Sequence, residues 1–114
     1  MEADERLPRS AVAAIASPEN QVLISAAVAW EIAIKVNLGK IKPPASIHDP
    51  SKVVADQGFV ELAITLDHAV RAGSLPQHHR DPFDRMLIAQ ALAEDVPIVS
   101  NDPRFDEYGV RRLW

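Results

Sequence analysis

The chain has 114 residues, of which 47% are hydrophobic and 25% charged, with a net charge of −4 and no cysteine. This balance indicates one globular domain over residues 1–114 and excludes disulfides, thiolate metal sites and nucleic-acid binding by general electrostatic attraction. No apolar run is long enough for a membrane span and the polar N-terminus has no signal core, so a cytoplasmic location is the simplest expectation.

Helical and strand-like patterns alternate along the chain. The pattern predicts first a helix over 10–16, a buried strand over 21–25, a helix over 26–38 and an amphipathic helix over 46–57. It then predicts a strand over 59–64, a helix over 66–75, a loop over 76–80, a helix from 81–84 to about 94, a strand over 97–100 and a closing strand over 110–113. This order predicts an α/β fold with helices on both faces of a parallel or mixed sheet.

Glu31 lies in the predicted helix 26–38, which is apolar on nearly every side. A helix of that kind is normally buried, and a buried carboxylate is costly unless it is paired, protonated or bound to a metal. The alternative is an ion pair with Lys35, one helical turn further on. The spacing leaves both interpretations open.

Two more carboxylates stand at the start of the helix that opens at 81–84. Asp81 can be the N-cap, Pro82 the first helical residue and Asp84 the acid of a capping-box-like start. Capping alone explains this pattern. It does not exclude metal binding, because a side chain in the first turn can point beyond the helix end.

Asp102 follows the predicted strand 97–100 in an Asn-Asp-Pro turn, which needs no functional explanation. Its place beyond the carboxyl end of a strand equally favours a ligand site. Mg²⁺ and Mn²⁺ prefer carboxylate oxygens, and such an ion can activate water and neutralise charge on a phosphodiester. A cluster of Glu31, Asp84 and Asp102 would therefore suit a site that holds such an ion.

Three segments resemble the metal-ligand segments of VapC-type PIN-domain ribonucleases. They are Trp30–Lys35 with Leu38–Ile41, then His79–Ala91, then Ile98–Phe105. The closing residues Tyr108–Val110 and Leu113–Trp114 also fit. The resemblance covers about Leu7 to Trp114, and its most specific block is Asp81–Arg85.

The resemblance implies a three-layer α/β/α fold with a mostly parallel sheet and a Mg²⁺- or Mn²⁺-dependent endoribonuclease. The metal-site carboxylates carried over are Glu31, Asp84 and Asp102, and the accessory residues are Asp81, Ser100 and Asn101. Ser100 and Asn101 would help to orient ligands or the attacking water.

Other polar residues near these segments receive weaker assignments. Arg80 and Arg85 are candidates for phosphate contact, although solvated surface arginines are the commoner case. His78 and His79 are expected to be exposed loop residues, because the acids suit a hard metal better. The implied partners are RNA, a cognate antitoxin and a second copy of the chain in a homodimer.

The sequence departs from the family pattern at its start. Family members open with an apolar strand that ends in an aspartate, and no such strand precedes Leu7. We therefore expect a truncated PIN domain, with unpaired strand edges, reduced stability and little nuclease activity. A misassigned start and a truncated gene are both open explanations.

Two other functions compete with the nuclease. One is a non-catalytic PIN remnant that binds an antitoxin or a homologous toxin. The other is a phospho-acceptor domain that uses Asp84 or Asp102, which is disfavoured because no matching lysine and threonine pattern stands out.

Overall fold

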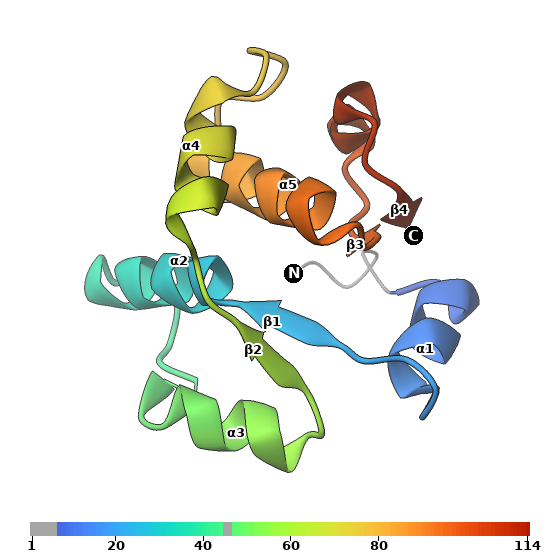
Figure 1. The fold of residues 1–114 in the computed structure, drawn as a ribbon. Coiled ribbons are helices and arrows are strands. Elements are labelled where there is room, and N and C mark those ends of the chain that lie inside the picture. Colours follow the sequence, from blue (N-terminus) through green and yellow to red (C-terminus); the bar gives the residue numbers. More distant parts are fainter. Residues whose placement is uncertain (1–6, 45–46) are drawn as a thin grey trace. The chain divides into compact units, whose positions relative to one another are not determined.

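The computed structural model describes residues 7–44 and 47–114, and the chain forms two compact units (Figure 1). The unit Gln21–Thr65 contains β1 (Leu23–Ser25), α2 (Ala26–Asn37), α3 (Pro50–Asp56) and β2 (Val60–Leu62). The other unit contains α1 (Arg9–Ala16), α4 (Leu66–Ser74), α5 (Pro82–Glu94), β3 (Ile98–Val99), the short 3₁₀ helix η2 (Pro103–Tyr108) and β4 (Arg112–Leu113). No helix in the described ranges has the length and apolar character of a membrane span.

In the Gln21–Thr65 unit, β1 and β2 pair in parallel. A parallel pair needs a crossover, and α2 and α3 supply it. Ser25 ends β1 and caps α2, because its hydroxyl accepts a hydrogen bond from Ala27 N at 3.1 Å. After α2, Gly39 adopts a φ of +73°, the left-handed conformation that glycine commonly takes where a helix ends.

The core of the second unit forms where α5, β3 and η2 meet. Its buried and partly buried apolar side chains are Ile88, Ala91, Phe105 and Val110, with Leu75, Val96, Ile98 and Tyr108 around them. β3 and β4 pair in parallel beside this core. Packing of α5 against these elements fixes the position from which its first turn extends.

Two helices of the second unit, α4 and α5, are also joined by a buried polar contact. His68 on α4 is 2% exposed, and its Nε2 lies 3.3 Å from Oε2 of Glu94 on α5. Its Nδ1 lies 3.3 Å from Nε2 of the buried Gln90. Both ring nitrogens therefore have partners, as buried polar groups require.

Arg85 is buried and holds the loop between α4 and α5. Its Nη2 donates to Ala72 O at 2.9 Å and to Leu75 O at 2.8 Å. Its Nη1 donates to Pro76 O at 2.9 Å and to His79 O at 3.2 Å. Carbonyl groups at a helix end and in the following loop need such donors. The expectation that Arg85 is a candidate for phosphate contact is therefore wrong, because its side chain is buried and its guanidinium already donates to four carbonyl groups.

The observed elements follow the expected order, and the structure confirms an α/β fold with parallel strand pairing. The strands are shorter than expected, and in the described residues they form two two-stranded sheets. The apolar helix α2 is more exposed than expected, since Ala27 is its buried residue and Trp30 is 60% exposed. The expected helix 46–57 is observed from Pro50, and its first residue, Ser46, lies outside the described residues.

Replacing Arg85 with methionine should lower the free energy of unfolding by about 3 kcal/mol, because four carbonyl groups lose a charged donor. The control is Arg71→Met, since Arg71 is exposed on α4 and pairs with Asp67 at 3.0 Å. An exposed pair contributes about 0–1 kcal/mol. Urea denaturation measures both variants, and equal losses would contradict the role given to Arg85.

Candidate functional site

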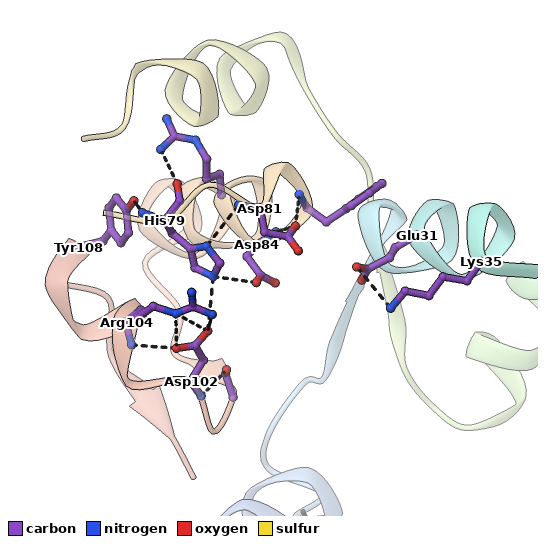
Figure 2. Close-up of polar contacts among 11 residues, drawn as sticks. Glu31, Lys35, His79, Asp81, Asp84, Asp102, Arg104 and Tyr108 are labelled. Atoms are coloured by element: carbon purple, nitrogen blue, oxygen red, sulfur yellow. Dashed lines mark hydrogen bonds and ion pairs between the residues drawn. The ribbon is translucent and has the colours of Figure 1, made fainter. Parts of the chain in front are cut away.

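Asp81 begins α5 and determines how Asp84 is presented. Its Oδ1 accepts hydrogen bonds from Phe83 N at 2.9 Å and from Asp84 N at 3.2 Å, so it is the N-cap. Pro82 takes the first helical position, as the sequence pattern predicts. Asp84 then extends from the first turn toward His79 (Figure 2).

Asp102 begins η2, just after β3. Its Oδ1 accepts a hydrogen bond from Arg104 N at 3.0 Å, and its own N donates to Ser100 Oγ at 3.1 Å. Ser100 therefore fixes the backbone from which the Asp102 carboxylate extends. Asn101, between them, is exposed.

His79 lies between the two carboxylates (Figure 2). Its Nε2 is 2.9 Å from Asp84 Oδ2 and 3.4 Å from Asp102 Oδ2. The residue is 5% exposed. Its backbone N donates to the Tyr108 hydroxyl at 2.7 Å, and its ring centre lies 5.9 Å from that of Phe105. Groups from η2 therefore hold a loop residue in contact with the acids.

The expectation that His79 is an exposed loop residue is wrong. Its burial depends on Tyr108 and Phe105, which lie far along the chain, and a short loop sequence carries no signal of such a cover. The neighbouring His78 does have the expected exposure, since 45% of its side chain is accessible. The one local signal for His79 is its place two residues before the N-cap Asp81, which allows the ring to turn toward the first turn of α5.

The two ring nitrogens of His79 have different surroundings. Nδ1 accepts a hydrogen bond from Asp81 N at 3.3 Å, so the neutral ring carries its proton on Nε2. Nε2 is buried and makes no hydrogen bond with any described residue, because short distances to two carboxylates do not give a suitable angle. A buried donor without an acceptor costs about 1–3 kcal/mol. Its position beside two acids is typical of a site that takes a ligand.

Arg104 stabilises the ionised form of Asp102. Its guanidinium donates to both carboxylate oxygens, with Nη2 2.8 Å from Oδ2. These bonds are the main reason why the pKa of Asp102 lies below its ordinary value of 3.8, while burial opposes them. Asp102 is therefore ionised at neutral pH and can serve as an anionic ligand.

The donor set fits a divalent cation. One ligand atom each from His79, Asp84 and Asp102 lies within 4.8 Å of the others. Carboxylate oxygens are the ligands that Mg²⁺ and Mn²⁺ prefer. Because the proton of His79 is on Nε2, this nitrogen is better suited to donate to an oxygen of the ligand than to bind the cation. The two carboxylates are thus the groups that could hold a cation, and His79 adds a hydrogen-bond donor beside them.

Glu31 belongs to the other unit of the chain, the one that contains α2. Its Oε2 lies 3.7 Å from Lys35 Nζ, and 30% of its side chain is exposed. The ion pair that the sequence offered as the alternative to metal binding is therefore present. The described residues place the side chains of Asp84 and Asp102 close together. That Glu31 is a ligand of the same metal site stays a prediction.

Comparison with known proteins gives one family. A model of the PIN domain matches residues 1–111. No curated protein and no solved structure gives a significant match to the chain. The matched range includes Glu31, His79, Asp84 and Asp102, so the likeness covers all the acids singled out above.

The tautomer of His79 can be measured directly by long-range proton–nitrogen NMR. We expect the proton on Nε2 and an Nδ1 shifted as a hydrogen-bond acceptor, because Asp81 N donates to Nδ1. The exposed His48 provides the control, because none of its contacts with the described residues favours one tautomer, and it should show a mixture of tautomers. A proton on Nδ1 of His79 would contradict the assignment and would make Nε2 a candidate cation ligand.

Proposed function

The chain belongs to the PIN-domain family, a family of nucleases, and on that premise we propose that it is a metal-dependent endoribonuclease. We further propose that it is the toxin of a type II toxin–antitoxin pair. The support for this finer assignment is the resemblance of three sequence segments to VapC-type ribonucleases. The net charge of −4 fits local contact with RNA through a bound cation better than a broad basic surface.

The main support for the nuclease proposal is that Asp84 and Asp102 both lie beside His79. The two acids begin different elements, α5 and η2, and each lies within 3.4 Å of the same nitrogen. Helix capping explains Asp81 fully and Asp102 in part. Capping does not require Asp84 to face Asp102 across a buried imidazole, whereas two neighbouring carboxylates suit the binding of a divalent cation.

A Mg²⁺ or Mn²⁺ ion held by Asp84, Asp102 and Glu31 would supply an activated water and neutralise charge on the phosphodiester. The other groups of the site position these ligands. Asp81 caps α5 and holds the ring of His79 through its backbone N–H. The Nε2–H of His79 is available to an oxygen of the ligand. In this proposal the accessory residues near Asp102 are Ser100, which accepts the Asp102 N–H, and Asn101, which is exposed beside it.

The proposed partners are RNA as substrate, a cognate antitoxin and a second copy of the chain, in the cytoplasm. Protein partners cover apolar surface, and several large apolar side chains on the helices are exposed. They are Val12 on α1, Trp30 on α2, Leu66 and Val70 on α4, and Leu38 just after α2. Such side chains support association with other proteins.

The competing proposal is a non-catalytic PIN module that binds an antitoxin or a homologous toxin. One observation favours it, because the Arg104 guanidinium already contacts both oxygens of Asp102. Titration with Mn²⁺ separates the two. A cation that binds only the folded chain stabilises it by about 2.7 kcal/mol at a concentration 100 times its Kd. Retained antitoxin binding without any such shift would support the module.

Cleavage of a mixed-sequence RNA in Mg²⁺ or Mn²⁺ tests the nuclease proposal. Asp84→Asn, Asp102→Asn and Glu31→Gln should each lower the rate by about 100-fold or more, because each removes a cation ligand. The matched control is Asp106→Asn, since Asp106 lies in the same η2 and pairs with Arg112 at 2.9 Å. Chelation by EDTA should abolish cleavage. Cleavage that persists in EDTA, or in all three variants, would overturn the proposal.

A further inference from the structure

Arg104 holds the Asp102 carboxylate from two directions (Figure 2). Its backbone N donates to Oδ1 at 3.0 Å. Its Nε lies 3.1 Å from Oδ1 and 3.2 Å from Oδ2, and its Nη2 lies 2.8 Å from Oδ2. The guanidinium therefore donates hydrogen bonds to both oxygens of the carboxylate.

These contacts fill the positions that a cation would need. A carboxylate offers about four lone-pair sites. At Asp102 the backbone N and Nε of Arg104 approach Oδ1, while its Nε and Nη2 approach Oδ2. His79 Nε2 lies a further 3.4 Å from Oδ2. A divalent ion that binds either oxygen of Asp102 must therefore compete with the side chain of Arg104.

The side chain of Arg104 is placed so that a cation can displace it from Asp102. It is 60% exposed, whereas that of Asp102 is 21% exposed. Exposed ion pairs are weak, because water screens them and the long side chain loses entropy when it is held. Arg85 is the opposite case, since it is buried and donates to four carbonyl groups. Of these two arginines near the acids, one is fixed in place and the other is releasable.

We propose that Arg104 is a displaceable internal counter-cation, which occupies Asp102 until a divalent cation takes its place. This inference rests on the proposed metal centre. It adds that competition from Arg104 helps to set the affinity of that centre for the cation. A divalent cation carries twice the charge of a guanidinium, so its attraction to a carboxylate that also has Asp84 as a neighbour is stronger. The exchange makes the site weaker for cations than its acids alone would be, and it keeps Asp102 paired when no metal is bound.

The test compares the binding of Mn²⁺ to the wild-type chain, Arg104→Gln and Arg71→Gln. Free Mn²⁺ is measured by electron paramagnetic resonance, so the result does not depend on catalysis. We expect Arg104→Gln to bind Mn²⁺ roughly fivefold more tightly, as removal of an exposed competitor predicts. Arg71→Gln removes the same charge from an exposed pair on α4 and should bind like the wild type. An equal gain in both variants would show a general charge effect and overturn the inference.

A second measurement follows Arg104 in the wild-type chain. Addition of Mg²⁺ should shift the NMR signal of the Arg104 Nε–H, because the guanidinium leaves Asp102, while the Arg71 signal should stay in place. If wild type and Arg104→Gln bind Mn²⁺ with the same affinity, the inference fails and the metal centre stands. If neither binds Mn²⁺, both fail. If only Arg104→Gln binds it, Arg104 blocks the site and is not displaced by the cation, which contradicts the inference.

Discussion

The loop between α4 and α5 is held from two sides, and the candidate site depends on this constraint. Arg85 donates to four carbonyl groups in and before the loop. The Tyr108 hydroxyl accepts from His79 N and donates to Pro76 O at 2.8 Å. With the backbone held at both points, the ring of His79 lies against Asp84 and Asp102. The site is thus a product of tertiary packing, although each acid is set by its own helix start.

Two arginines that are close in sequence to the acids differ in where their side chains lie. Arg85 follows Asp84 directly, yet its side chain turns into the protein and completes the end of α4. Arg104 follows Asp102 by two residues, and its side chain remains at the surface on the carboxylate. One guanidinium gives rigidity and the other gives a charge that can move.

Local rules made part of this arrangement predictable. The Asp81–Pro82 start of α5, the turn at Asp102 and the glycine that ends α2 follow from capping and turn preferences, which depend on neighbouring residues. The burial of His79 and Arg85 depends on partners elsewhere in the chain, so sequence reasoning missed it. Composition was misleading for α2, because an apolar helix was expected to be buried and Trp30 is largely exposed. The spacing of Glu31 and Lys35 in the sequence predicts their ion pair, which is present. That ion pair neither requires nor excludes a role of Glu31 in metal binding.

The central claim is that Asp84 and Asp102 share one divalent cation beside His79. Anomalous diffraction from a crystal of the chain grown with Mn²⁺ tests it most directly. We predict a single strong anomalous peak in contact with carboxylate oxygens of both residues, with the Arg104 guanidinium moved off Asp102. A peak bound elsewhere, or none at saturating Mn²⁺, would contradict the account.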